Sequence, residues 1–228
     1  MLDVHIVKQR GHVGIDISFS CEEGRLLALT GPSGCGKTTI IRTLAGLERP
    51  DSGHISFKQK DWYNSTKKIF LQPRRRKVGY VFQEHTLFPH LTVRNNIGFA
   101  CRDEQRVTEL LELLRIRHLE DSSPQQISGG ERQRAALAQA LASEPEVLLL
   151  DEPFSALDGL TRKRLHRELS SLKNRLGIPI ILVTHDLEEA RELGDHHVCL
   201  EQGTVISCTR KDRAGVVPAP LAALPVCC

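Results

Sequence analysis

Gly31-Pro-Ser-Gly-Cys-Gly-Lys-Thr-Thr39 matches the phosphate-loop pattern G-x-x-x-x-G-K-[ST]. The apolar run 25–30 before it predicts a buried strand, and residues 39–46 after it predict a helix. A glycine-rich turn between a strand and a helix directs backbone N–H groups at a phosphate, and the helix N-terminus adds positive partial charge. The sequence therefore predicts a site for the phosphates of a nucleotide.

The side chains of this loop have separate expected roles. Lys37 is expected to reach the β- and γ-phosphate oxygens, and the hydroxyl of Thr38 can bind Mg²⁺. The Cys35 thiol stands at a variable position of the pattern, and we interpret it as a group open to thiol reagents and not as a catalyst. The predicted nucleotide-binding set is Gly31, Pro32, Ser33, Gly34, Cys35, Gly36, Lys37, Thr38 and Thr39.

The composition fits one α/β domain with a sizeable core. The chain has 228 residues, of which 40% are hydrophobic, and it carries 31 basic and 28 acidic residues. This near balance argues neither for nor against nucleic acid, and we interpret the basic run 74–77 as a solvated surface turn. No apolar run approaches the ~20 residues of a membrane span, and the N-terminus lacks the layout of a signal peptide. We therefore expect a soluble, cytosolic chain when it is alone.

The seven cysteines are scattered, odd in number and without a C-x-x-C pair. This arrangement indicates neither a disulfide framework nor a zinc site. Residues 227–228 are both cysteine, but they do not fit the spacing of a prenylation motif. The cysteines therefore predict no cross-link and no metal centre.

The spacing of apolar residues divides the chain into a sheet region and an inserted helical region. Alternation over residues 4–19 predicts antiparallel strands, and residues 53–57 and 78–82 predict further short strands of a mixed sheet. Between about 84 and 145 the spacing becomes helical, with one apolar stripe over 106–116. A helical subdomain is thus expected inside the sheet domain.

Two near-continuous apolar runs, 146–150 and 179–184, follow the helical region. Such runs are typical of parallel strands buried on both faces, and the segment 161–176 between them predicts a helix. From about 209 the chain becomes rich in proline and alanine without periodicity, which predicts a loose tail.

Two acidic residues end the first of these runs. Asp151 is expected to join the shell of a metal ion, and Glu152 is expected to polarise a water in line with the γ-phosphate. The bland alternative is a strand followed by an acidic turn.

A second anion site is predicted at Ser128. Ser128 and Glu131 fit a capping box at a helix start, and the paired glycines Gly129 and Gly130 leave the first N–H groups of that helix open to an anion. Two half-sites in one chain suggest a nucleotide held between two copies.

These motifs resemble, in their order, those of the ATP-binding cassette family over residues 1 to about 207. The matching segments are the phosphate loop, Gln83 after 78–82, the signature 127–134, the acidic pair, Ser155-Ala-Leu-Asp158 and Thr184-His-Asp186. The resemblance implies an α/β fold, a P-loop NTPase (RecA-like) core with an N-terminal antiparallel β subdomain and an inserted helical subdomain. The cassette would span residues 1–208, followed by the tail 209–228 and no C-terminal regulatory domain.

The resemblance also implies roles for individual residues. Gln83 senses Mg²⁺ and the γ-phosphate and links to the membrane partner, and His185 contacts the γ-phosphate. Asp158 lines the dimer interface. Glu152, His185 and Gln83 are then the catalytic set, and Thr38, Gln83 and Asp151 the Mg²⁺ set. The residues expected to close over the ATP of the opposite subunit are Ser128, Gly129, Gly130, Gln133 and Asp158. Alone, His185 after an apolar strand would more often be a capping or core histidine.

The activity implied is hydrolysis of ATP, with Mg²⁺, by a subunit that lies peripherally on the cytoplasmic face of the inner membrane. Its implied partners are a second copy in a head-to-tail homodimer, membrane permease subunits and, indirectly, a solute-binding protein, with no nucleic acid. A rival interpretation is a soluble cassette protein of translation, repair or cofactor assembly. Among importers the sequence looks most like those for molybdate or tungstate, with sulfate and iron(III) importers as alternatives.

One departure from the family concerns the base of the nucleotide. The family usually has an aromatic residue before the first strand turn that stacks on adenine, but residues 8–13 contain none. His12 is the expected weak substitute, so other nucleoside triphosphates are also expected as substrates.

Overall fold

The structure is a computed structural model, and it describes residues 1–11, 13–83, 87–155 and 157–210. His12, most of the predicted tail and the terminal cysteine pair lie outside the described residues. Among the helices in the described ranges, none is long and apolar enough to cross a membrane.

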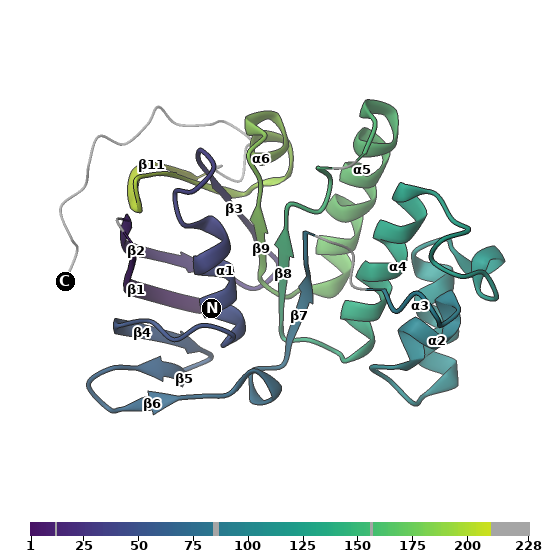
Figure 1. Cartoon of the computed structure of the whole chain (residues 1–228), viewed down its shortest axis with the longest axis horizontal. Helices are drawn as coiled ribbons and strands as arrows, with labels where there is room; N and C mark the ends of the chain where they lie inside the picture. Colours follow the sequence, from purple (N-terminus) through teal and green to yellow (C-terminus); the bar gives the residue numbers. More distant parts are fainter. Residues whose placement is uncertain (12, 84–86, 156, 211–228) are drawn as a thin grey trace.

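The described strands form one sheet in the order β6-β5-β4-β1-β2-β11-β10-β3-β9-β8-β7 (Figure 1). The strands β3, β9, β8 and β7 are parallel to one another, and β10 is parallel to β3. The strands β6, β5, β4, β1 and β2 form an antiparallel arm, as the N-terminal alternation predicts. The strands are β1 (Leu2–Arg10), β2 (Val13–Cys21), β3 (Leu26–Thr30), β4 (Ser52–Phe57), β5 (Lys60–Asn64), β6 (Ile69–Phe70), β7 (Val78–Val81), β8 (Val147–Asp151), β9 (Ile180–Val183), β10 (His196–Glu201) and β11 (Thr204–Arg210).

Helices pack on both sides of the parallel strands. Every residue of β3, β8 and β9 is buried, and alternate residues of each strand face two different hydrophobic clusters. One cluster contains α1 and the antiparallel arm, and the other contains the remaining helices. The helices are α1 (Lys37–Ala45), α2 (Val93–Gly98), α3 (Glu104–Leu113), α4 (Gly129–Ala142), α5 (Gly159–Leu176) and α6 (Leu187–Leu193), with 3₁₀ turns at Pro73–Arg75 and Arg117–Leu119.

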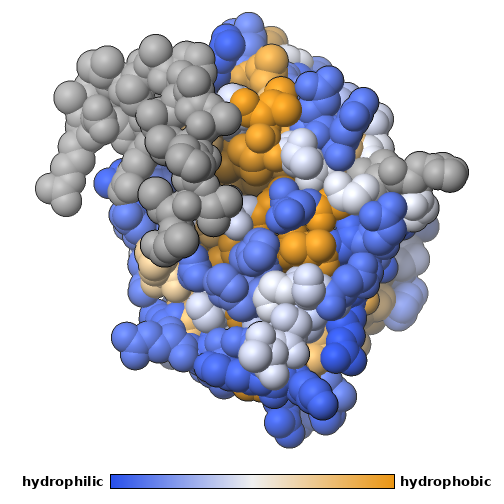
Figure 2. All heavy atoms as spheres, turned by 90° about the vertical axis from the view of Figure 1, so that its left-hand side faces the viewer, coloured by the Kyte–Doolittle hydropathy of each residue, from blue (hydrophilic) through white to orange (hydrophobic). Residues whose placement is uncertain are grey.

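The helical subdomain lies at the end of the molecule opposite the antiparallel arm (Figure 1). It consists of α2, α3 and α4, which pack on one another and fall within the range predicted to be helical. At the other end, the antiparallel arm presents a mainly polar outer surface with an apolar area (Figure 2). Next to the arm, strand β11 carries two exposed apolar side chains, Val205 and Ile206, which are 36% and 54% exposed.

The basic run 74–77 is only partly the solvated turn that the sequence predicts. Arg76 is buried, and its guanidinium donates to the carbonyls of Thr43 and Leu44, both at 2.8 Å, in the last turn of α1. It also lies over the rings of Trp62 and Phe70, 5.7 and 5.4 Å from their centroids. Burial lowers the pKa of Arg76 to about 10. A cation at the C-terminus of α1 complements the helix dipole, so this arginine anchors the helix that follows the phosphate loop.

We predict that Arg76→Met destabilises the chain by about 1–3 kcal/mol, because the Leu44 carbonyl would lose its charged donor and the Thr43 carbonyl would keep only the N–H of Gly46. The measurement is chemical denaturation followed by circular dichroism. Arg75→Met is the matched control, since Arg75 is exposed. An equal loss of unfolding free energy in the two variants would contradict the anchoring role of Arg76.

Candidate nucleotide-binding site

The phosphate loop joins β3 to α1, as predicted, and two of its glycines are required by their surroundings. Gly31 has φ 147°, and a Cβ there would lie 2.2 Å from the carbonyl oxygen of Leu200. Gly36 has φ 106°, and a Cβ there would lie 2.7 Å from Ile15. Only glycine therefore allows the loop to turn this closely against the ends of β10 and β2.

The Lys37 ammonium points into the loop. It is 6% exposed and donates to the carbonyls of Gly31 at 2.7 Å and Pro32 at 2.9 Å. No side chain caps the first turn of α1, and that turn contains no acidic residue. The N–H groups of this turn and the lysine thus form a concentrated positive site, which suits phosphate oxygens.

The expectation that the Cys35 thiol is open to reagents is wrong for this structure. Cys35 is buried, and its sulfur lies 3.7 Å from Lys37 Nζ beneath the turn of the loop. The loop backbone must fold over position 35 to direct its N–H groups outward, and this covers the thiol.

A cleft of about 580 Å³ opens above the loop. At one end it is lined by Gln83, Glu152 and His185, which follow β7, β8 and β9. At the other end it is lined by Arg10 and Ile15 of β1 and β2. The sheet order puts these two groups on opposite sides of β3, so a chain of phosphates over the loop would have one end at Glu152 and the other at Arg10.

Glu152 and His185 meet at the first end of the cleft. His185 Nδ1 lies 3.1 Å from Glu152 Oε2. Glu152 has φ 46°, a left-handed conformation that is uncommon for a residue other than glycine. Other turns of the described chain contain non-glycine residues in this region too, so it is the contact with His185, and not the backbone alone, that indicates a functional role for Glu152. This pair can hold and orient a water molecule beside a terminal phosphate.

Asp151 ends β8 as predicted and is buried, 3% exposed. The hydroxyl of Tyr80 donates to Asp151 Oδ2 at 3.1 Å, whereas the buried Oδ1 has no hydrogen-bond partner among the described residues. Burial raises the pKa of Asp151, and the Tyr80 hydrogen bond and Lys37 oppose that rise.

An unpartnered buried carboxylate oxygen fits a cation. Thr38 is exposed at the start of α1 and lines the cleft, as does Glu152, the residue that follows Asp151, so the Thr38 hydroxyl is available as a second ligand. The described residues contain no cluster of three or more His, Cys, Asp or Glu side chains that could hold a metal alone. Mg²⁺ commonly takes one or two protein ligands together with phosphate and water, and Asp151 with Thr38 fits that pattern.

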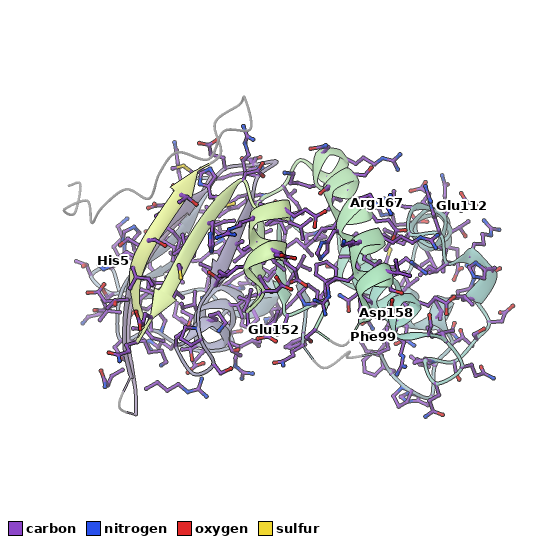
Figure 3. All side chains as sticks on the ribbon, turned by 90° about the horizontal axis from the view of Figure 1, so that it is seen from above. His5, Phe99, Glu112, Glu152, Asp158 and Arg167 are labelled. Atoms are coloured by element: carbon purple, nitrogen blue, oxygen red, sulfur yellow. The ribbon has the colours of Figure 1, made fainter. Side chains whose placement is uncertain are left out.

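The predicted second half-site lies away from this cleft. Ser128 is exposed and starts α4 with the predicted capping box to Glu131. A Cβ at Gly130 would lie 2.6 Å from Thr161 on α5, so glycine lets the two helices approach. Asp158 is also exposed and caps α5 (Figure 3). Neither Ser128 nor Asp158 lines the cleft of its own chain.

Gln133 does not belong with these exposed residues. Its side chain is 4% exposed on the inner side of α4, where it lines a small internal cavity with Leu137 and Phe154. The helical period turns position 133 toward the core when position 128 is at the surface, so we remove Gln133 from the predicted set.

Sequence reasoning missed Arg10 and Tyr80. Arg10 Nη1 donates to Thr39 Oγ1 at 2.6 Å, and Arg10 is the cation at the end of the cleft where a base was expected to meet His12. A single arginine at a strand end carries no sequence signal of this kind. Tyr80 lies in a strand that was predicted, but only the sheet register brings it beside Asp151.

A model of the ABC transporter family matches residues 15–155, more than half of the chain. The chain belongs to this family. Among curated proteins, it is 46% identical to the sulfate/thiosulfate import ATP-binding protein CysA of Salmonella typhi, over 90% of this chain and 58% of that protein. It is 50% identical to CysA 2 of Agrobacterium fabrum, over 84% of this chain and 57% of that protein. The cassette thus spans a little more than half the length of these relatives.

Solved structures of cassettes share the fold. The structure of cbiO1 from Clostridium perfringens, described as part of the ABC transporter complex cbiONQ, aligns with a TM-score of 0.79 and 30% identity, over 91% of this chain and 87% of that one. The cassette MJ0796, in a dimeric post-hydrolysis state bound to ADP and Pi, aligns with a TM-score of 0.75 and 27% identity, over 92% and 98%. These likenesses agree with the predicted P-loop fold.

We predict that Tyr80→Phe raises the Mg²⁺ concentration needed for half-maximal nucleotide turnover by about 10-fold or more, the usual effect of losing a group that orients a metal ligand. The ring is retained, so its stacking on Phe82, with ring centroids 3.9 Å apart, should persist. The measurement is a Mg²⁺ titration of phosphate release.

The chain provides a matched control. Tyr63 is also buried, and its hydroxyl donates to the Pro50 carbonyl in the antiparallel arm, away from the cleft. Tyr63→Phe should leave the Mg²⁺ requirement unchanged. Equal Mg²⁺ requirements in both variants and the wild type would show that Tyr80 does not orient Asp151.

Proposed function

We propose that this chain is the ATP-hydrolysing subunit of an importer. The observation that carries the proposal is the cleft itself, with Lys37 in the phosphate loop and the Glu152–His185 pair 3.1 Å apart at one end. Lys37 neutralises the β- and γ-phosphates of ATP, and the first turn of α1 donates its N–H groups to them.

Hydrolysis follows from the pair at the end of the cleft. Glu152 orients a water molecule in line with the γ-phosphorus and accepts its proton as the new P–O bond forms and the bond to ADP breaks. His185 holds the Glu152 carboxylate and contacts the γ-phosphate, and Gln83 lines the same end. Mg²⁺, held by Thr38 and Asp151 with Gln83 nearby, neutralises charge on the phosphates when it is bound.

The active form proposed is a head-to-tail homodimer. Ser128 caps helix α4, which begins at Gly129, and neither Ser128, Gly129 nor Gly130 lines the cleft of its own chain, so a second copy is needed to bring this N-terminus to a nucleotide. Asp158 lies at the start of the neighbouring helix α5. The dimeric form of a solved cassette with 27% identity supports this arrangement.

The partners proposed are permease subunits, on whose cytoplasmic face the dimer lies, and a solute-binding protein that delivers the solute to them. Sulfate or thiosulfate is the solute we propose, because the relatives with 46–50% identity carry that name. The names of these relatives favour a sulfate importer, which the sequence left as an alternative, over a molybdate importer. They also favour an importer over a soluble cassette of translation or repair.

The test of the ATPase is Glu152→Gln. An amide cannot accept the proton of the attacking water, so turnover should fall by roughly 10²–10⁴ while ATP binding is retained. The measurements are phosphate release, and size-exclusion chromatography with ATP, in which the variant should elute as a dimer. Lys37→Ala is the comparison, because it should lose ATP binding and therefore remain monomeric. Turnover near the wild-type rate in Glu152→Gln would refute the assignment.

The solute is tested in cells. A strain without this subunit should fail to grow on limiting sulfate and recover with cysteine, because only sulfur uptake would be missing. Normal growth on sulfate, together with loss of molybdoenzyme activity at trace molybdate, would favour molybdate instead.

A further inference from the structure

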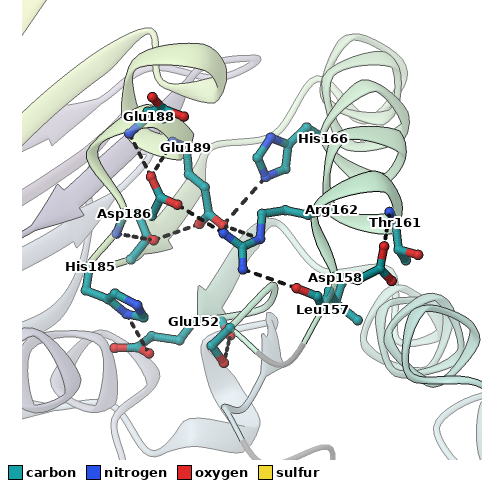
Figure 4. A network of polar contacts seen from close by, with 12 residues as sticks. Glu152, Leu157, Asp158, Thr161, Arg162, His166, His185, Asp186, Glu188 and Glu189 are labelled. Atoms are coloured by element: carbon teal, nitrogen blue, oxygen red, sulfur yellow. Dashed lines mark hydrogen bonds and ion pairs between the residues drawn. The ribbon is translucent and has the colours of Figure 1, made fainter.

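A polar network joins the two loops on which the proposed reaction depends. Asp158 caps the N-terminus of α5, and Asp186, directly after His185, caps the N-terminus of α6. Figure 4 shows the side chains between these helices. Any movement of α5 against α6 therefore changes the position of Asp158, which is expected at the dimer interface, relative to His185.

Arg162, in the first turn of α5, makes the first set of contacts across this junction. Its guanidinium lies 3.1 Å from Asp186 Oδ2 and 3.6 Å from Glu189 Oε1, and it donates to the Leu157 carbonyl at 3.2 Å. The Thr184 hydroxyl donates to Glu189 Oε2 at 2.7 Å. Glu189, which is buried, is thus tied to both loops at once.

His166, one turn further along α5, makes the second set. Its Nδ1 lies 2.7 Å from Glu192 Oε2, and its Nε2 lies 3.7 Å from Glu189 Oε1. The ring also meets Phe154 edge-on, with centroids 4.8 Å apart, and Phe154 follows Glu152 by two residues. The imidazole, buried, is therefore at the meeting point of the segments that carry Glu152, Asp158 and His185.

The charge of this imidazole is not fixed. Burial lowers its pKa, but the carboxylates of Glu189 and Glu192 outweigh burial and hold the pKa of His166 above its ordinary value. Arg162 on α5 and Asp186 at the start of α6 also carry charges in this network, and the Glu152–His185 pair lies beside them. A protonated His166 gives the carboxylates a second cation beside Arg162. With a neutral ring, Arg162 is the one cation in the described part of this network that faces Glu189.

We propose that His166 is a positioning residue whose protonation clamps α5 to α6 and thereby aligns Glu152, His185 and the Asp158 loop for hydrolysis. The inference rests on the proposed ATPase function. Because the folded state raises the pKa of His166, the ring is charged and the contacts between α5 and α6 are complete at low pH. They are lost as the pH rises through the pKa of His166 in the folded state. Turnover should therefore decline toward alkaline pH. His166 does not itself line the cleft, so its protonation acts on turnover through the loops that it positions.

The experiment is the pH dependence of kcat and KM for ATP between about pH 6 and 9, measured on the full chain. Wild-type kcat should fall severalfold, on the order of fivefold, across the titration. The kcat of His166→Lys should stay near the wild-type value at pH 6 over the whole range, because lysine stays charged there. The kcat of His166→Gln should stay near the wild-type value at pH 9, because glutamine is uncharged. His54→Gln, at a half-exposed histidine paired with Asp3 in the antiparallel arm, is the control and should follow the wild type.

A second variant guards against misfolding of the first. Glu192 is half-exposed, so Glu192→Gln should fold, and loss of its charge should move the midpoint of the kcat profile to lower pH. Profiles of His166→Lys and Glu192→Gln that coincide with the wild type would overturn the inference, even if their melting temperatures fall. If the wild type showed no ATPase activity, or if its activity survived in Lys37→Ala, the proposed function itself would be overturned.

Discussion

The burial of β3, β8 and β9 on both faces is the constraint on which the site depends. Parallel strands covered on both sides must end at a common edge, and each of these three strands ends in a polar segment. The loops that follow them contain Lys37, Glu152 and His185, whose side chains line one cleft. Ligands of open α/β sheets bind at this carboxyl edge, because there the helix N-termini and loop N–H groups point outward. The chemistry is therefore assembled by strand packing and not by sequence proximity.

Two arginines that are distant in sequence support the helix at the centre of this arrangement. Arg76 binds the carbonyls at the C-terminal end of α1, and Arg10 binds Thr39 at its N-terminal end. The helix that presents its N-terminus to the phosphates is thus fixed at both ends from outside. A rigid helix matters because the energy of charged hydrogen bonds depends on their geometry.

The motifs predicted much of the fold and the cleft, because their chemistry depends on local spacing. The phosphate loop, the strand that ends at Asp151 and the helix capped by Ser128 are all as predicted. The burial of Arg76, Cys35 and Gln133 was missed, since whether a polar side chain is covered depends on elements far away in sequence. The strands β5, β6, β10 and β11 were also missed; β5 and β6 have only five and two residues, and β10 mixes polar with apolar residues, HHVCLE, so none of these three gives a clear apolar run. The Asp151–Tyr80 contact required the register of two parallel strands, which no single segment contains.

The central claim is that one nucleotide is held by two copies of this chain, between the phosphate loop of one and Ser128 of the other. The most direct test is a crystal structure of the Glu152→Gln variant with ATP and Mg²⁺. The account predicts a symmetric dimer with two nucleotides, in which Lys37 of one copy and Ser128 of its partner contact the same γ-phosphate. A structure in which ATP is fully enclosed by a single chain, with Ser128 facing solvent, would contradict it.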